Sequence, residues 1–232
     1  MTPDTRLNHS LPLLLHVATV ITGLIDAISY LALGHVFTAN MTGNVVFLAF
    51  AVAGAPGLSL TRSLTALIAF LIGALIGGRV ATHLSGVFTP SWIRIALSLE
   101  SALLLVATLA AINFHDLSGR SFQLYSIIVL TACAMGIRNA IVRRMAIPDL
   151  TTTVLTLTIT GLAADSGFAG GTNPRWRLRL LAVLLMFAGA ALGTLLLRRS
   201  LVLALATAAL LSICCAVISM KQRVALSTRA TS

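Results

Sequence analysis

The chain has 232 residues, of which 58% are hydrophobic and only 9% carry a charge. Soluble domains carry about 25% charged residues, because a surface that faces water needs them. The composition therefore excludes a soluble globule and predicts an all-α membrane protein with lipid against much of its surface. The net charge of +10 does not indicate nucleic-acid binding, because the basic residues stand in short clusters between apolar runs.

Six apolar segments are long enough to cross a bilayer, whose hydrocarbon core takes about 20 helical residues. Two shorter apolar segments each begin with polar residues and are too short to cross easily. We therefore expect a polytopic helical protein with six spans plus two short re-entrant or half-helix segments, with eight spans as the alternative. The six lie at 13–33, 62–84, 92–112, 122–145, 178–197 and 201–219, and the short segments at 40–56 and 149–164.

The distribution of Lys and Arg favours six spans. With the N-terminus inside, six spans leave only Arg62, Arg120, Arg198 and Arg199 of the 16 basic residues outside. Eight spans divide the basic residues almost evenly between the two sides. Because positive residues are enriched on the cytoplasmic side of membrane proteins, we expect six spans, a cytoplasmic N-terminus and a location in a bacterial inner membrane.

Similar motifs recur about 113–116 residues apart. Gly23–Ile28 resembles Gly136–Ile141, and Gly73–Gly77 resembles Gly189–Gly193. This spacing predicts two internally repeated halves, which is common in secondary transporters and would make the halves inverted if six helices span. The predicted organisation is a cytoplasmic tail at 1–10, a first membrane repeat at 11–112, a second membrane repeat at 122–219, and a polar tail at 220–232.

Asp26 lies in the middle of the first predicted span, where a charge costs a few kcal/mol. Its neighbours at helical spacing are polar or small, so they form a stripe that faces protein or water. Such a stripe indicates an ion or substrate ligand, or a proton carrier, and a structural ion pair is the alternative. The stripe contains Thr19, Thr22, Gly23, Ser29 and Tyr30.

In the second half, Arg138 and Asn139 lie at the place that corresponds to Asp26 in the first half. If the halves meet along these helices, Arg138 can approach Asp26, because paired charges cost far less than a lone one. Glu100, a secondary candidate, falls inside the third long segment. We expect it to pair with Arg94 or Arg79, in a role that is more structural than functional.

Both short segments begin with polar residues. The first contains Asn40, Thr42, Gly43 and Asn44, and the second contains Thr151–Thr153. Helix N-termini carry unsatisfied N–H groups and partial positive charge. Two such starts that meet at the membrane centre would form a site for a polar or anionic solute, to which Thr151 and Thr152 would contribute. Simple N-capping is the alternative, since Asn and Thr favour that position.

The chain has no nucleophile elbow, phosphate loop or HExxH motif, so we expect no enzyme and no catalytic residues. Its three cysteines lie in apolar segments without metal-ligand spacing, so we expect no metal and no cofactor. Two GxxxG matches predict close helix packing and permit a homodimer.

The segments Gly23–Ala27 and Phe37–Asn44 together resemble the YoaK-like family of bacterial transmembrane proteins, whose function is uncharacterised. Phe70–Ala74 and Gly136–Ala140 are similar to later motifs of that family. The resemblance covers about residues 11–220 and implies a small bacterial membrane protein with about six spans. It implies no substrate.

The repeat and the intramembrane polar residues together predict a small secondary transporter or channel-like carrier for a polar solute, with its site between the two halves. In this hypothesis Asp26 binds a cation or proton, Thr38–Asn44 bind the solute, and Arg138 balances charge. Expected partners are the lipid bilayer and a small polar solute or ion, without nucleic acid. The alternative is a non-transporting membrane scaffold or accessory protein.

Overall fold

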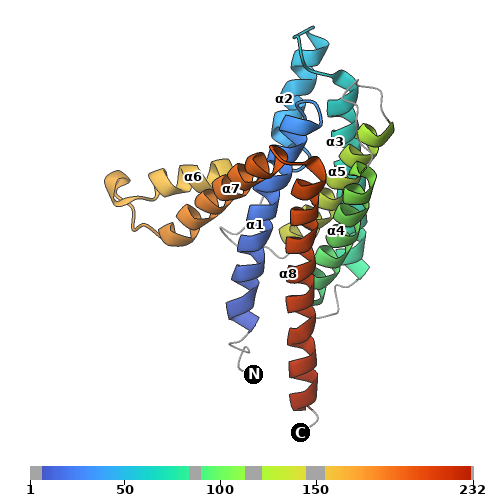
Figure 1. Cartoon of the computed structure of the whole chain (residues 1–232). Helices are drawn as coiled ribbons and strands as arrows, with labels where there is room; N and C mark the ends of the chain where they lie inside the picture. The colour runs from blue at the N-terminus through green and yellow to red at the C-terminus, as the bar shows by residue number, and fades with distance from the viewer. Residues whose placement is uncertain (1–6, 84–89, 113–121, 145–154, 231–232) are drawn as a thin grey trace.

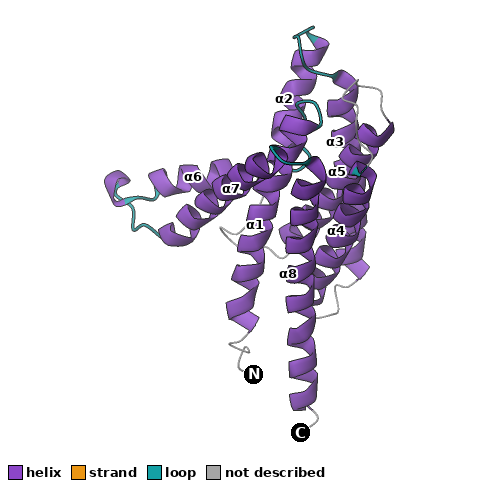
Figure 2. Ribbon diagram, viewed as in Figure 1, coloured by secondary structure: helices purple, strands orange, loops and turns teal. Residues whose placement is uncertain are grey.

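The computed structural model describes residues 7–83, 90–112, 122–144 and 155–230, and the described residues form helices joined by turns, without a strand (Figures 1 and 2). The fold is therefore all-α, as predicted. The helices are α1 (Leu7–Ala32), α2 (Met41–Val52), α3 (Leu60–His83), α4 (Pro90–Ala111), α5 (Phe122–Arg144), α6 (Leu155–Ala164), the short 3-10 helix η1 (Gly167–Ala169), α7 (Trp176–Leu197) and α8 (Leu201–Ala230).

Six of these helices are long and apolar enough to cross a membrane, namely α1, α3, α4, α5, α7 and α8. The two short helices, α2 and α6, are also apolar but have 12 and 10 residues. At a rise of about 1.5 Å per residue, α2 is roughly 18 Å long, which is well short of the roughly 30 Å hydrocarbon core. This confirms the prediction of six spans plus two short segments.

A break between α1 and α2 separates a spanning helix from a short one. Gly34 and His35 follow α1 with φ angles of 86° and 60°, in the left-handed region that ends a helix. Asn40 then caps α2 by accepting a hydrogen bond from the N–H of Gly43. The residues between, 33–40, are called the break segment below.

Helix α1 crosses α7 at glycines, so that the two backbones touch. A Cβ added to Gly23 would overlap the carbonyl oxygen of Met186, and one added to Gly189 would overlap that of Val20. Contacting residue numbers rise together along the two helices, so α1 and α7 run in the same direction. Glycine is required here because any side chain would hold the helices apart.

Helix α5 crosses α3 with the same set of contacts. A Cβ on Gly136 would overlap the carbonyl oxygen of Phe70, and one on Gly73 would overlap that of Cys133. These four residues correspond to the four of the α1–α7 crossing at the offsets of 113 and 116 residues found in the sequence. The first helix of each half therefore packs on the third helix of the other half: α1 packs on α7, and α5 packs on α3. This arrangement interlocks the two halves. The duplication itself stays a prediction.

The glycine motifs Gly73–Gly77 and Gly189–Gly193 both lie in these helix–helix contacts. They explain close packing inside the chain, as predicted. A homodimer would have to use another surface.

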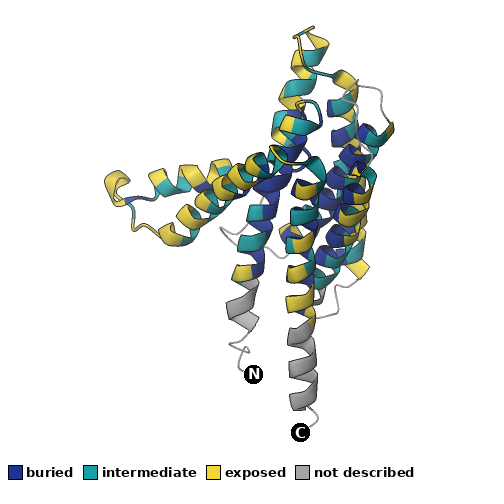
Figure 3. Ribbon diagram, viewed as in Figure 1, coloured by how far each residue is buried: buried dark blue, intermediate teal, exposed yellow. Residues whose placement is uncertain are grey.

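The centre of the fold is formed by α1 and α5, where 67% and 61% of the spanning windows are buried, against 17% for α7. Figure 3 shows this difference, with buried positions along α1 and exposed ones along the α6–α7 hairpin that projects from the bundle. Helices α4 and α8 pack beside the centre, where Ser101 donates a hydrogen bond to Ser212 at 2.9 Å. Beyond Arg177 in its first turn, the exposed side chains of α7 are apolar, as expected for helices that face lipid.

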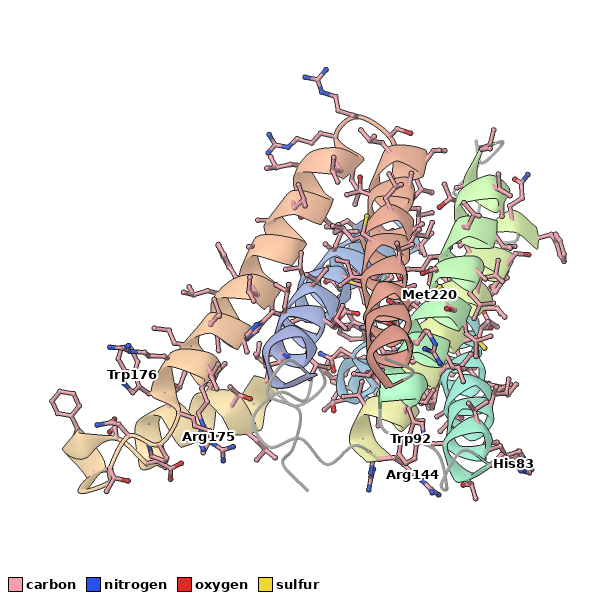
Figure 4. The ribbon with its side chains drawn as sticks, turned by 90° about the horizontal axis from the view of Figure 1, so that it is seen from below. His83, Trp92, Arg144, Arg175, Trp176 and Met220 are labelled. Carbon is pink, nitrogen blue, oxygen red and sulfur yellow. The ribbon has the colours of Figure 1, made fainter. Side chains whose placement is uncertain are left out.

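Because six helices span the membrane, successive helix ends lie alternately on its two faces. The end of α3, the start of α4, the end of α5 and the start of α7 share one face, which we call the basic face. In Figure 4, His83, Trp92, Arg144 and Arg175 lie toward one edge of the molecule, in agreement with this assignment. The basic face contains Arg79, His83, Arg94, Arg143, Arg144, Arg175, Arg177 and Arg179, and the opposite face contains Arg62, Arg198 and Arg199.

Two adjacent glycines of α3 test the crossing. We expect Gly77→Ala to lower the free energy of unfolding by about 1–3 kcal/mol, because its Cβ would lie 2.5 Å from the carbonyl oxygen of Ile137. Gly78→Ala is the matched control. Its Cβ would meet nothing within 4 Å, so this change should be neutral or stabilise the helix slightly. Thermal unfolding in detergent measures both, and equal effects would contradict the crossing.

Three cysteine substitutions test the number of spans without any assumption about orientation. In a chain whose native cysteines are replaced, we expect a membrane-impermeant maleimide to label Ser59→Cys and Ser200→Cys from the same side, and Thr82→Cys from the other. Eight spans would instead place Thr82 with Ser200 and leave Ser59 alone. That second pattern would overturn the six-span topology.

Candidate functional site

The polar stripe of α1 faces the interior of the protein, as predicted. Thr19, Thr22, Asp26 and Ser29 are all buried. The hydroxyls of Thr19 and Thr22 donate to carbonyl oxygens one turn earlier in the helix, at 2.9 Å each. Their spacing of three or four residues places them on one side of α1, and that side packs into the bundle. Asp26 is therefore shielded from lipid by protein.

Arg138 of α5 lies at the meeting point of α1, α4 and α5. It is 1% exposed and forms an ion pair with Glu100 of α4, with 2.8 Å between Nη1 and Oε1. Its other terminal nitrogen, Nη2, donates to the hydroxyl of Thr22 on α1 at 2.5 Å. A guanidinium has several donors in a fixed plane, so one side chain can tie two neighbouring helices to its own.

The expected partners of Glu100 were wrong. Glu100 pairs with Arg138, rather than with Arg94 or Arg79. The physical reason is the packing of α4 along α5, which brings the mid-span acid of one helix to the buried base of the other. Since neither charge can reach water, each requires the other.

Asp26 anchors the break segment to the core. Its Oδ1 accepts the N–H of Ala39 at 3.0 Å, and the N–H of Asn40 also interacts with the carboxylate. The ion pair of Arg138 is with Glu100 rather than with Asp26, the partner that the sequence favoured, and the charge of Arg138 acts on Asp26 only at longer range. Asp26, Glu100, Arg138 and Thr22 thus form one buried polar group, which we call the charge cluster.

Several backbone polar groups of the break segment are satisfied by side chains. Asn44 accepts the N–H of Phe37 at 2.8 Å through Oδ1, and its Nδ2 donates to the carbonyl oxygen of the same residue. The N–H of Thr38 donates to the hydroxyl of Ser29 at 3.3 Å. Non-helical backbone at membrane depth is tolerated only where protein satisfies it in this way.

The other predicted site residues are placed less centrally. In this conformation Asn44 holds Phe37, Asn40 caps α2, and Thr42 is exposed. Gly43 lets the Phe37 ring lie against α2, since a Cβ there would come within 2.7 Å of the ring. Asn139 lies on α5 beside Arg138 and is half-buried. Thr151 and Thr152 lie outside the described residues.

Aromatic rings cover the break segment. The ring of Tyr30 stacks on that of Phe37 with 5.3 Å between centroids, and Phe37 stacks on Phe47 at 5.5 Å. His35 meets the edge of Tyr30 at 5.1 Å. Tyr30, predicted as a secondary site residue, is therefore part of an aromatic cap next to the charge cluster.

A narrow space leads toward Arg138 from the basic face. It has an accessible volume of about 10 Å³, which is near the minimum for one water molecule. Within the charge cluster, Nε of Arg138 and Oε2 of Glu100 have no hydrogen-bond partner among the described residues. The walls are apolar side chains of α1, α4 and α5, namely Leu14, Leu15, Ala18, Ile93, Ala96, Leu97 and Val142.

The described residues contain no group of three or more His, Cys, Asp or Glu side chains that could hold a metal ion. The charge cluster itself offers charges and hydrogen-bonding groups. It offers a donor on Arg138, an acceptor on Glu100, and a carboxylate on Asp26 that is linked to a break in a helix. The pairing of Glu100 with Arg138 was missed in the sequence, although both lie well inside long apolar segments and carry opposite charges.

Comparison with known proteins agrees with the motif resemblance. The chain matches the family described as "Protein of unknown function (DUF1275)" over residues 14–218. It is 37% identical over 153 residues to the UPF0700 transmembrane protein YoaK of Bacillus subtilis (strain 168). That alignment covers 66% of the chain and 65% of YoaK, so the chain spans slightly less than two thirds of this relative. No solved structure matches the chain. The family match and the six apolar helices establish that the chain belongs to the DUF1275 family and is a multi-pass membrane protein.

Proposed function

We propose that the protein is a small secondary transporter or channel-like carrier for a polar solute, with its site at the charge cluster. The observation that carries this proposal is the burial of Asp26, Glu100 and Arg138 at membrane depth, beside a broken helix. Ionisable residues inside a membrane are expensive and mark ion and solute pathways. Broken helices that line such sites are typical of secondary transporters.

Folding alone does not account for the charge cluster. A buried ion pair usually contributes no more stability than apolar side chains of the same volume would. A scaffold would therefore gain nothing from Glu100 and Arg138 that leucines could not supply. A carrier gains a polar centre whose unused donor and acceptor can receive a solute or an ion.

The position of the charge cluster also supports a carrier. Toward the opposite face it is covered by the break segment and the aromatic cap. Toward the basic face it is separated from the surface by the narrow apolar space described above. The charge cluster is thus closed toward both membrane faces, and by a different structure on each. A carrier needs two separate closures of this kind, because it opens to one face at a time. The two matching helix crossings are where the two halves meet, and a carrier would have to turn its halves at these contacts.

We also propose an orientation and a location. The basic face carries most of the described arginines at helix ends, so it lies in the cytoplasm, and the N-terminus with it. The membrane is the inner membrane of a bacterium, the partners are lipid and a small polar solute or ion, and no enzymatic chemistry or cofactor is part of the proposal.

A non-transporting scaffold or accessory role is the second candidate. It is favoured by the hydrogen bonds of Asn44, whose amide is fully used in holding Phe37. It is also favoured by the small volume beside Arg138. In a scaffold the charge cluster and the break segment would keep one arrangement.

Movement at the opposite face separates these candidates. For a carrier, we expect spin labels at Ser59→Cys and Ser200→Cys to show two distances in lipid, measured by pulsed electron paramagnetic resonance. Asp26→Ala should shift the ratio of the two populations about tenfold or more, because the break segment loses the hydrogen bond that Asp26 accepts from Ala39.

Proteoliposomes that contain the carrier should also take up at least one solute from a panel of amino acids, sugars and organic acids, and Asp26→Asn should abolish this uptake.

The control for this experiment is Thr19→Ala, since the hydroxyl of Thr19 bonds only to its own helix in the described structure. It should leave the two distances and their ratio unchanged. A single narrow distance that neither substitution alters, together with no uptake above empty liposomes, would favour the scaffold.

Because Glu100 and Arg138 are paired, we expect a single substitution to lower the free energy of unfolding more than a substitution of both residues does. We expect Glu100→Gln to cost about 3–5 kcal/mol of unfolding free energy, because it leaves the Arg138 charge buried without a counter-charge. The double variant Glu100→Leu with Arg138→Leu should recover at least half of that loss. Asp165→Asn breaks a pair with Arg179 in which Asp165 is 43% exposed, so it should cost about 1 kcal/mol or less. Chemical unfolding in detergent measures all three, and a double variant less stable than Glu100→Gln would refute the assigned pairing.

A further inference from the structure

The tip of the α6–α7 hairpin, residues 161–179, is a folded unit rather than a simple turn. The N–H of Asn173 donates to the carbonyl oxygen of Asp165 at 2.9 Å, which closes the loop around η1. The carboxylate of Asp165 pairs with Arg179 at 2.6 Å, and Arg179 also donates to the carbonyl oxygen of Gly161 at 2.9 Å. These contacts join the end of α6 to the first turn of α7, so the surface of the tip has a defined shape.

An open groove of about 1000 Å³ runs over this tip. Its floor is mainly apolar and includes Leu162, Ala163, Phe168 and Trp176. The Phe168 side chain is fully exposed, and Trp176 is 45% exposed. Exposed aromatic side chains at the end of a spanning helix are typical of the zone where lipid headgroups meet the hydrocarbon core.

Two arginines stand next to Trp176, one of the residues that line the groove. Arg175 and Arg177 flank Trp176 in the chain, and both are exposed. The guanidinium of Arg177 lies 5.5 Å from the centre of the Trp176 ring, a cation–π contact that holds the charge next to the apolar floor. Among the described residues of the tip, three arginines accompany a single carboxylate, that of Asp165, so the tip has a net positive charge.

The tip also lies where lipid headgroups are expected. It belongs to the basic face, and Figure 4 shows Arg175 and Trp176 toward the same edge as Arg144 and His83. The hairpin projects from the bundle, so bilayer lipid can reach it from its sides (Figure 1). In the orientation proposed above this face meets the cytoplasmic leaflet, whose anionic lipids attract basic segments.

We propose that this groove is a binding site for an anionic phospholipid. An acyl chain would lie along Leu162, Phe168 and Trp176, and the phosphate would bind Arg175 and Arg177. Guanidinium groups bind phosphate oxygens through paired, charge-assisted hydrogen bonds. An anionic lipid is preferred over one whose headgroup is neutral overall, because the cationic group of the neutral headgroup offsets the attraction of its phosphate to the arginines. The site is distant in the sequence and the fold from the charge cluster, so it stands whether or not the protein is a transporter.

The test is lipid binding to the purified full chain in detergent, measured by native mass spectrometry with phosphatidylglycerol and phosphatidylcholine of equal chain length. We expect phosphatidylglycerol to bind at least tenfold more tightly. The double variant Arg175→Gln with Arg177→Gln should lose about 10- to 30-fold in that affinity, since each basic residue near an anionic lipid contributes about 1 kcal/mol.

The matched control lies at the other end of the same helix. Arg198→Gln with Arg199→Gln also removes two exposed arginines, here directly after α7, and it should leave the affinity unchanged. An equal loss in both double variants would mean diffuse attraction to positive charge and would overturn the proposal. Displacement of the lipid by millimolar inorganic phosphate would instead make the groove a site for free phosphate.

A second variant keeps the test independent of the arginines. Phe168→Ala with Trp176→Leu retains every charge and changes only exposed side chains, so the fold should persist. It should weaken phosphatidylglycerol binding several-fold and leave thermal unfolding within a few degrees of the native chain. A lipid-free dimer that these substitutions dissociate would assign the groove to a second copy and overturn the lipid site.

Discussion

A guanidinium that cannot reach water sets the requirements for the centre of this fold. Arg138 is buried where the surrounding solvent is lipid, so its donors must find their acceptors within the protein. Glu100 supplies one acceptor from α4 and Thr22 supplies another from α1. Three helices are therefore held at one point by a single side chain, and the most buried helices of the molecule, α1 and α5, are two of them.

The glycine crossings fix how the outer helices attach to that centre. Helices α3 and α7 contact α5 and α1 through backbone atoms, which needs no side-chain matching and little buried apolar area. Lipid is as apolar as leucine, so association in the bilayer depends on such close approach rather than on a hydrophobic driving force. The polar contacts can then be concentrated in the middle of the bundle, while α7 presents mostly apolar side chains to its surroundings.

Much of this arrangement could be predicted from local sequence pattern, because length and hydropathy decide what can span a bilayer. The six spans, the two short helices and the inward-facing stripe around Asp26 follow from residue type and helical period. The partner of Glu100 could not be predicted in this way, since it depends on which helices pack together. The same limit applies to Asn44: an amide at a helix start can bind a solute or cap its own chain, and only the tertiary position of Phe37 decides between them.

The crossing of α7 over α1 has a mechanical consequence. The glycine contacts of α7 with α1 lie between Met186 and Gly193, and the earlier part of α7 projects from the bundle, so this part can turn about those contacts (Figure 1). From Gly189 to Trp176 the arm of α7 is about 20 Å long, at about 1.5 Å per residue. A rotation of about 10° at those contacts would therefore move the hairpin tip by roughly 3–4 Å, as follows from the same helix length. Helix α3 has no such free arm on α5, because the two helices contact each other from the Thr61–Tyr125 hydrogen bond to the contact of Gly77 with Ile137. The α6–α7 hairpin is thus the part of the fold that the glycine crossings leave able to turn.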